Sequence, residues 1–285
     1  MTTSHGIVRG IGAYRYGGAA CLLRNGEVHV WTLQLDLERA AKERLETFLS
    51  EAEVARARRF ENADYRRRWV GAHGLLRVVL SGYTGTPPEE VAFEDGPGGK
   101  PRLADCAGPR FNLSHADGLA LVAVSLDREV GVDVERVREI GSLRALADNC
   151  FSAAERTALD RIAGPQRLQA AFAGWTRKEA FLKALGDGLA RPLDSFDVTL
   201  VPGEPVRLLR VDDAPEAPGR YTLRAVRPAP GYVGAVAVDG RDAKIRWRPW
   251  ELLAATLQSM DAGRGRRREA GEPARREPRR GRECA

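Results

Sequence analysis

The chain has 285 residues, 43% hydrophobic and 29% charged, enough to bury the core of one large domain or two smaller ones. No apolar run is long enough to cross a bilayer, and the first 18 residues lack the apolar segment of a secretory signal. The four cysteines show neither metal-ligand spacing nor a Cys-x-x-Cys pair. These features argue against a membrane-spanning protein and a zinc site, and they predict a cytoplasmic protein in a reducing compartment.

The net charge of +6 is concentrated at the C-terminus. From Asp261 onward there are nine arginines and five acidic residues, which leaves only +2 for the other 260 residues. Because the basic isoelectric point is mainly a property of this tail, it is weak support for a nucleic-acid-binding body.

The expected elements form two similar runs, each with strands around a group of helices. In the first run the strands cover 27–35, 91–93, 110–114 and 119–126, and the helices cover 37–49, 51–60 and 63–80. In the second, strands cover 129–137, 196–200, 206–211, 221–226, 232–238 and 245–248, with helices at 142–149, after a capping box at 152–155, and at 165–185.

These runs predict an α+β protein made of two similar halves packed face to face, with a ligand cleft between them. The expected divisions are an extension at 1–26, a first lobe at 27–125 and a second lobe at 126–248. A closing helix at 249–262 and a disordered basic tail at 263–285 complete the chain.

Two carboxylates share one face of an expected strand, because side chains alternate along Gly131-Val132-Asp133-Val134-Glu135. Neighbouring carboxylates repel each other unless a cation lies between them, and Mg²⁺ suits one or two carboxylates plus a phosphate. Alone, Asp133 and Glu135 are more simply interpreted as polar residues that face water.

The long expected helix carries Trp175, Glu179 and Lys183 at i, i+4 and i+8, so these side chains lie along one side, with Lys178 beside them. The plain alternative is a surface helix with one Glu–Lys pair and an anchoring tryptophan.

Further polar groups could bind phosphate. Ser114 and His115 end an extended run, and Lys100 lies on a glycine-rich loop. Adjacent Ser and His cannot readily act as nucleophile and base, and no Gly-x-Ser-x-Gly is present, which argues against a hydrolase. Six arginines form a basic cluster in the first half, although most of them are expected on a solvated helix face: they are Arg56, Arg58, Arg59, Arg66, Arg67 and Arg68.

In chain order these motifs resemble one family. They are Gly-Lys-Pro at 99–101, Phe-Asn-Leu-Ser-His at 111–115, Gly-Val-Asp-Val-Glu at 131–135, Phe-Ser-Ala-Ala-Glu at 151–155, Trp-Thr-Arg-Lys-Glu-Ala-Phe-Leu-Lys at 175–183 and Pro-Leu-Asp-Ser-Phe at 192–196. From about Val28 to Val238 the chain resembles the two-lobed, Sfp-type 4'-phosphopantetheinyl transferases.

The resemblance implies two α+β lobes related by a pseudo-twofold axis, with coenzyme A between them. It also implies Mg²⁺-dependent transfer of the phosphopantetheine arm to a serine of an acyl or peptidyl carrier protein, with 3',5'-ADP as the other product. The carrier could serve fatty-acid, polyketide or nonribosomal peptide synthesis, and the enzyme is expected to be monomeric, without membrane or specific nucleic-acid partners.

By motif position, the resemblance implies Mg²⁺ ligands at Asp133, Glu135 and Glu179, with Asp133, Glu179 and Lys183 as the catalytic residues. The residues implied to bind coenzyme A are Arg56, Arg68, Lys100, Ser114, His115, Lys178 and Lys183. Glu53 stands where some members have a lysine, so the contacts with the 3'-phosphate depart from the family pattern.

The chemistry leaves two choices. Either Glu179 or a metal-bound water could accept the proton of the carrier serine. Glu155 either completes a capping box with Ser152 or serves as the family's acid after Phe-Ser, and we favour the cap.

Because the strand supplies two ligands and the helix the third, the metal site is predicted to need a folded second lobe.

Two other functions deserve a test: a coenzyme A-binding protein without catalysis, and a basic nucleic-acid-binding protein. The presence of all three carboxylates and both lysines of the motifs argues against the first.

Deletion of residues 263–285 tests the second. Since most of the excess charge lies in this tail, we expect the truncated protein to modify carriers and to lose any affinity for nucleic acid in a gel-shift measurement. Retained nucleic-acid affinity together with lost transfer would favour the nucleic-acid-binding protein.

Overall fold

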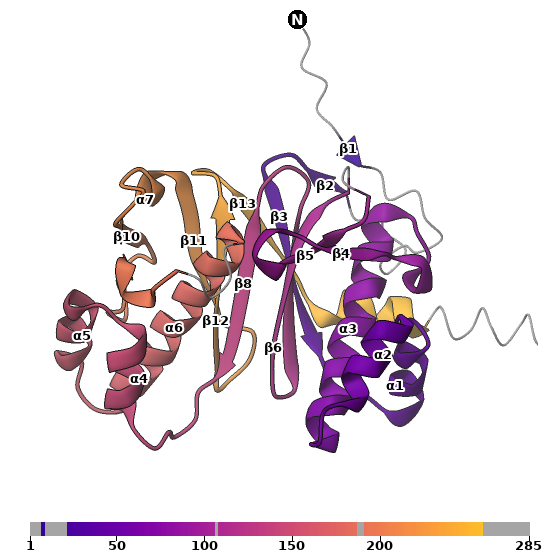
Figure 1. Cartoon of the computed structure of the whole chain (residues 1–285), viewed down its shortest axis with the longest axis horizontal. Coiled ribbons are helices and arrows are strands. Elements are labelled where there is room, and N and C mark those ends of the chain that lie inside the picture. The colour runs from indigo at the N-terminus through magenta and orange to yellow at the C-terminus, as the bar shows by residue number, and fades with distance from the viewer. Residues whose placement is uncertain (1–6, 9–21, 106–107, 187–190, 259–285) are drawn as a thin grey trace, which may run out of the picture.

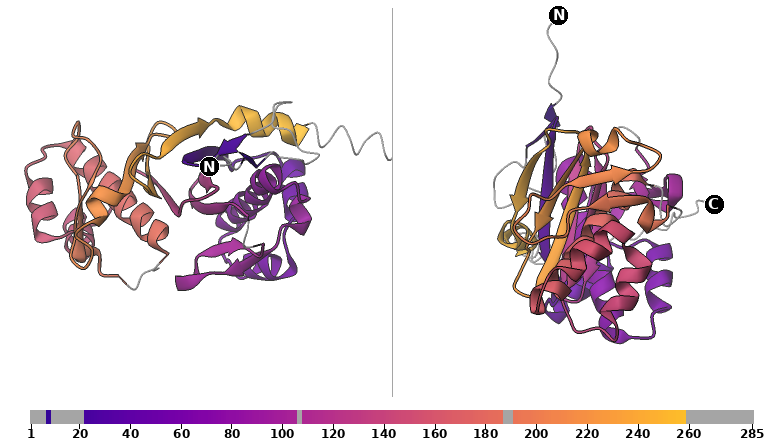
Figure 2. Two further views of the ribbon diagram at one scale, coloured as in Figure 1. Left: turned by 90° about the horizontal axis from the view of Figure 1, so that it is seen from above. Right: turned by 90° about the vertical axis from the view of Figure 1, so that its left-hand side faces the viewer.

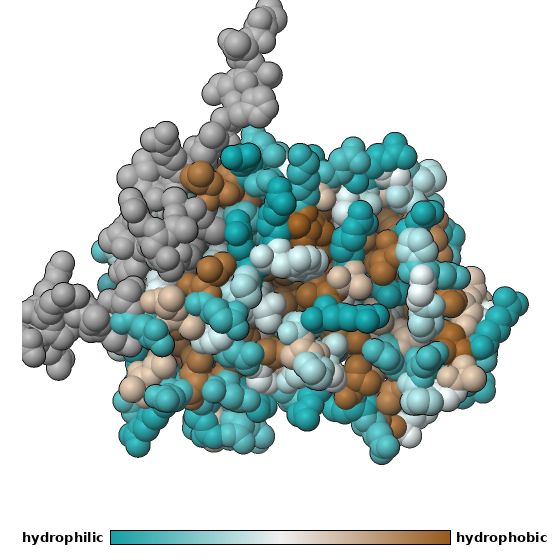
Figure 3. Space-filling view, turned by 180° about the vertical axis from the view of Figure 1, so that it is seen from behind, coloured by the Kyte–Doolittle hydropathy of each residue, from teal (hydrophilic) through white to brown (hydrophobic). Residues whose placement is uncertain are grey.

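The computed structural model describes residues 7–8, 22–105, 108–186 and 191–258, which form a mixed α+β structure. Helices lie at both sides in Figure 1, with the strands between them. None of the helices in these ranges is both long and apolar enough to cross a membrane. Hydrophobic residues reach the surface in Figure 3 as separate patches among hydrophilic ones.

The two larger sheets organise these residues. The first has the strand order β13 (Lys244–Arg248), β3 (Glu27–Gln34), β7 (Leu119–Ser125) and β6 (Arg110–Ala116). The second has the order β11 (Tyr221–Val226), β12 (Tyr232–Asp239) and β8 (Val130–Arg136). Each of the two sheets has its own group of helices.

The first group of helices comprises α1 (Arg39–Glu46), α2 (Glu51–Arg58) and α3 (Ala63–Thr84). The second comprises α4 (Leu143–Cys150), α5 (Ala153–Asp160) and α6 (Pro165–Leu185), and the short α7 (Ala217–Arg220) precedes β11. Three two-stranded pairs complete the strands: β1 (Ile7–Val8) with β2 (Leu23–Arg24), β4 (Phe93–Asp95) with β5 (Pro101–Leu103), and β9 (Phe196–Val198) with β10 (Leu208–Val211). Short 3₁₀ turns cover Pro88–Glu90, Pro97–Gly99 and Leu193–Ser195.

Period-2 alternation places the two faces of each sheet in different cores. On β3, Trp31 and Leu33 face α3, whereas Val28 and Val30 face the second sheet. The valines of β8 meet them there, and the other side of the second sheet packs on α6. The sheets are therefore packed against each other, with helices outside both (Figure 1).

The edges of the two sheets meet where β6 lies beside β8. The N–H of Val132 donates to Asn112 Oδ1 at 2.8 Å, and the N–H of Val134 reaches Ser114 Oγ at 3.4 Å. Side chains of β6 thus satisfy the outward backbone donors of β8, a strand whose other edge pairs with β12.

Several predicted helix ends are confirmed. The capping box predicted at 152–155 forms between Ser152 and Glu155, a second one joins Ser50 and Glu53, and Gly186 ends α6 in the left-handed region at φ 80°. Helix α1 begins after Glu38, two residues later than the expected start at residue 37, and Asp36 accepts hydrogen bonds from Arg68.

The predicted boundaries need two corrections. Residues 245–248, expected in the second lobe, belong to β13, which pairs in parallel with β3 of the first sheet (Figure 2). Leu23, expected in an N-terminal extension, is fully buried in the first core. Strand alternation shows which residues share a face but not which sheet receives the strand. Residues 250–258 are helical and bury Leu253 in the same core, whereas the predicted tail at 263–285 lies outside the described residues.

His29 joins β13, β3 and α3 through buried polar contacts. Arg248 Nη2 lies 2.9 Å from His29 Nε2, and because a guanidinium can only donate, Nε2 is the acceptor. The proton is therefore on Nδ1, which donates to the Tyr83 hydroxyl at 2.6 Å. Burial, followed by the charges of Arg248 and Arg246, lowers the pKa of His29 to about 3.

We expect His29 to make stability depend on pH. Between its unfolded pKa near 6.5 and its folded pKa of about 3, only the unfolded chain binds the proton. Stability is therefore full above pH 6.5 and falls as the pH drops, by at most about 1.4 kcal/mol per pH unit for this one group.

Urea denaturation across this range measures the slope. His29→Gln keeps an acceptor for Arg248 and should make the slope shallower, with His73, whose pKa burial lowers to about 4, supplying part of what is left. An unchanged slope in His29→Gln would contradict the assignment.

Candidate active site

The site is built where α6 crosses one face of β8. Gly131, Asp133 and Glu135 alternate with the valines of the inter-sheet core, so they face the helix. A Cβ on Gly131 would lie 2.0 Å from the carbonyl oxygen of Ala180 and 2.3 Å from the backbone nitrogen of Ala184. Only glycine allows the helix backbone to rest directly on this strand.

The predicted stripe on α6 faces the strand. Trp175 lies close enough to Glu135 to lower the pKa of that carboxyl, and Lys183 Nζ lies 2.6 Å from Asp133 Oδ1. Burial, followed by the charge of Asp133, raises the pKa of Glu179, which lies one turn before Lys183. Along β8 from Glu135 toward Gly131, the facing helix residues run from Trp175 toward Ala184, so the two elements are antiparallel.

The carboxylates of the site repel one another. Burial, followed by the charge of Asp133, raises the pKa of both Glu135 and Glu179, and Lys183 opposes the rise. Asp133 Oδ2 and Glu179 Oε1 are buried without a hydrogen-bond partner. By contrast, Glu135 is paired with Arg138 at 3.7 Å. A cation would relieve this repulsion and satisfy the unpaired oxygens.

Within the described ranges, no group of three or more His, Cys, Asp or Glu side chains is already arranged to hold a metal ion. The ammonium of Lys183 fills part of the space among the carboxylates, since it binds Asp133 Oδ1. The predicted ligands Asp133, Glu135 and Glu179 are therefore neighbours on two packed elements, and two of their oxygens suit a hard cation.

Ser114 and His115 both reach this site from β6. The Ser114 hydroxyl donates to Asp133 Oδ1 at 2.7 Å and lies 3.2 Å from Lys183 Nζ. His115 is half-buried beside the rings of Tyr65 and His73, and burial, followed by the charge of Lys183, lowers its pKa. Ser114 thus orients Asp133, a role that the sequence analysis did not foresee.

Lys100 lies at a cavity of about 270 Å³ that opens beside the carboxylates. Its Nζ contacts Glu129 Oε2 at 2.7 Å and the carbonyl oxygen of Val130 at 2.9 Å. The cavity lining comes from the glycine-rich loop, β6 and α6: Gly98, Gly99, Lys100, Pro101, Asn112, Glu179, Leu182, Lys183 and Gly186. The structure therefore brings Lys100, Glu179 and Lys183 to one hollow.

The expectation that Lys178 binds coenzyme A phosphates is wrong for this structure. Its side chain is fully buried and is paired with Glu155 at 2.7 Å. It also donates to the carbonyl oxygens of Leu193 and Phe196. Lys178 follows Arg177 on the helix face opposite the site. The i, i+4 spacing of Trp175, Glu179 and Lys183 does not reveal that this face is buried.

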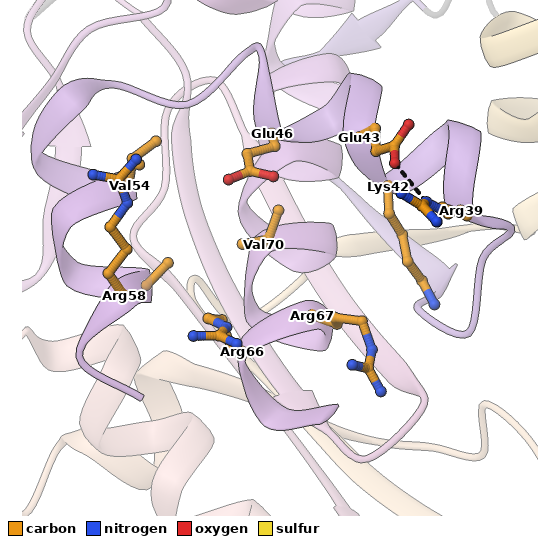
Figure 4. Close-up of a pocket in the computed structure, with 10 residues that line it drawn as sticks. Arg39, Lys42, Glu43, Glu46, Val54, Arg58, Arg66, Arg67 and Val70 are labelled. Carbon is orange, nitrogen blue, oxygen red and sulfur yellow. Dashed lines mark hydrogen bonds and ion pairs between the residues drawn. The ribbon is translucent and has the colours of Figure 1, made fainter. Parts of the chain in front are cut away.

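The predicted arginines lie at the first helices. Arg68 binds Asp36 and Asp117, and Arg56 lies over the ring of Trp69. Neither residue lines the cavity at Lys100. Other members of the basic cluster line a separate hollow of about 460 Å³ among α1, α2 and α3 (Figure 4): these are Arg58, Arg66 and Arg67.

Substitution of Gly131 tests the contact of α6 with β8. Gly131→Ala adds a methyl group where only backbone atoms can give way, so we expect a loss of about 1–3 kcal/mol of stability in urea denaturation. Gly141→Ala is the matched control, because a Cβ there meets no atom within 4 Å. Equal stability of the two variants would show that the helix does not rest on Gly131.

The chain is similar to known proteins of one superfamily. Residues 129–237 match the 4'-phosphopantetheinyl transferase superfamily. The chain is 38% identical over 230 residues to the 4'-phosphopantetheinyl transferase HetI of Nostoc sp. (strain PCC 7120 / SAG 25.82 / UTEX 2576), a match that covers 80% of this chain and 92% of HetI. It is 28% identical over 206 residues to the 4'-phosphopantetheinyl transferase Sfp of Bacillus subtilis (strain 168), covering 72% of this chain and 89% of Sfp.

The match to HetI covers 80% of the chain and so extends well beyond the segment 129–237 that the superfamily match covers. The chain belongs to the 4'-phosphopantetheinyl transferase superfamily.

Proposed function

We propose that the protein transfers the 4'-phosphopantetheine arm of coenzyme A to a serine of an apo acyl or peptidyl carrier protein, with 3',5'-ADP as the second product. The observation that carries this proposal is that Glu179 and Lys183 line the cavity with Lys100, while Lys183 also pairs with Asp133. Carboxylates for a cation and lysines for phosphate oxygens are the groups that phosphoryl transfer requires.

We further propose two lobes related by pseudo-twofold symmetry, divided between β7 and β8, with coenzyme A in the cleft between them. The cavity supports this proposal, because Lys100 and Asn112 come from the first half and Glu179 and Lys183 from the second. Since one chain supplies both walls, we propose that the enzyme acts as a monomer.

Mg²⁺ is the cation that we assign to Asp133, Glu135 and Glu179, where it would neutralise the pyrophosphate and hold the reacting oxygens in line. The unpaired oxygens of Asp133 and Glu179 and the repulsion among the three carboxylates support the assignment. Asp133 is already fixed by Ser114, so its second oxygen is oriented before any cation binds.

We assign the remaining steps to two residues of α6. Glu179 would accept the proton of the carrier serine, with a cation-bound water as the alternative acceptor. Lys183 stabilises the leaving 3',5'-ADP through its ammonium, which lies at the cavity. Lys100 contacts the adenosine side, and His115 a phosphate.

Intact-mass measurement of an apo carrier incubated with the protein, coenzyme A and MgCl₂ tests the proposal. We expect the mass of one phosphopantetheine to be added, and we expect EDTA to stop the reaction until Mg²⁺ is returned. Unchanged masses across fatty-acid, polyketide and peptide carriers would refute the function.

Removal of the carboxylate charge of Asp133 or Glu179 should lower the transfer rate strongly. We expect Asp133→Asn and Glu179→Gln each to lower kcat about 100-fold or more, because each removes charge stabilisation of the transition state. Glu139→Gln removes an exposed carboxylate outside the site and serves as the control. Near-normal rates at low Mg²⁺ in either site variant would show that the metal assignment is wrong.

A further inference from the structure

The side of α6 that faces away from β8 carries a buried cation. Lys178 is fully buried, and its Nζ lies 2.7 Å from Glu155 Oε2, 2.7 Å from the carbonyl oxygen of Leu193 and 2.6 Å from that of Phe196. An ammonium has three protons, so these partners account for all of its donors. Lys178 therefore has no free proton and no exposed surface with which to bind a phosphate.

Its partner Glu155 is equally committed. Glu155 Oε2 accepts the N–H of Ser152 at 2.9 Å in the capping box, and Oε1 accepts the N–H of Val198 at 2.8 Å. One buried carboxylate therefore joins the start of α5, strand β9 and helix α6. Such a pair is costly to desolvate, and it is retained here with every polar atom of its charged groups satisfied.

A second cation strengthens the same attachment. Arg177 is buried and donates to the carbonyl oxygen of Thr199. Arg177 and Lys178 thus fix two consecutive positions of α6 to the segment 193–199. Since consecutive helix residues are separated by about 100°, Glu179 is turned from this anchored side toward β8. The contact of Ala180 with Gly131 holds the helix from the strand side.

We infer that Lys178 is a positioning residue: with Glu155 and Arg177 it sets the rotation of α6 about its axis, and thereby the place of Glu179 and Lys183 at Asp133. The inference rests on the proposed function for its kinetic consequence. It assigns Lys178 to the hydrogen-bonded framework of the second half rather than to coenzyme A.

Three variants test the inference: Lys178→Met, Glu155→Gln, and the two combined. Lys178→Met keeps the length of the side chain but leaves Glu155 as an unpaired buried charge. We expect kcat to fall about 10- to 100-fold through misplacement of Glu179, with KM for coenzyme A changed less than about 2-fold. The combined variant should recover part of the loss, because it leaves no uncompensated charge.

A core variant separates positioning from general loss of stability. Leu159→Ala truncates a buried side chain of α5 that has no polar contact with α6, and it should cost about 2–5 kcal/mol of stability. Assayed well below its melting temperature, it should keep kcat within about 2-fold of the wild type. If Lys178→Met does not fold, Glu155→Gln and the combined variant carry the same comparison.

A readout independent of activity is the indole N–H resonance of Trp175, assigned by its loss in Trp175→Phe. Trp175 neighbours Glu135 across the same contact, so a rotated helix should shift this resonance in Lys178→Met but not in Leu159→Ala. If KM for coenzyme A rises 10-fold or more at constant kcat, Lys178 is a ligand and the inference is wrong. It is also wrong if the Trp175 resonance stays in place or if Leu159→Ala lowers kcat equally.

A wild-type protein that modifies no carrier refutes the proposed function instead, while the resonance still tests the positioning.

Discussion

The direct contact of two backbones at Gly131 is the constraint on which the site depends. With Ala180 and Ala184 opposite it, α6 lies on β8 without any intervening side chain. Long side chains further along both elements then meet at short distances, as Lys183 does with Asp133. A larger residue at 131 would move the whole helix away, and with it every group that α6 brings to the strand. The glycine of the Gly-Val-Asp-Val-Glu motif is therefore explained by packing, and its carboxylates by charge.

The contact between α6 and β8 holds more negative than positive charge. Asp133, Glu135 and Glu179 share a partly buried space with Lys183, where burial, followed by the charge of Asp133, raises the pKa of both glutamates. Ser114 adds a hydrogen bond to Asp133 but no charge. A divalent cation would supply the missing positive charge.

The sequence predicted this site well where a regular period applied. The strand alternation that pairs Asp133 with Glu135 and the helical spacing that aligns Trp175, Glu179 and Lys183 both hold in the structure. The pattern failed for Lys178, because a charged residue beside an exposed stripe suggests exposure, and its partner Glu155 lies in another helix. The sequence pattern also did not reveal the partner of β13, which pairs with β3 of the first sheet although it follows the second sheet in the chain. Local periods determine faces, whereas such long-range pairings depend on which surfaces remain free after the rest has packed.

The second half alone does not complete the site, contrary to what the positions of the three carboxylates in the sequence suggest. Strand β8 is an edge strand of its sheet, and its outward N–H groups bind Asn112 and Ser114 of the first half. Ser114 then holds Asp133, and Lys100 reaches back to the carbonyl oxygen of Val130. Without the first half, β8 would expose unpaired donors and Asp133 would lose its oriented hydroxyl. The strand that carries the carboxylates is thus shared by both halves, and its geometry depends on their contact as much as on the helix that crosses it.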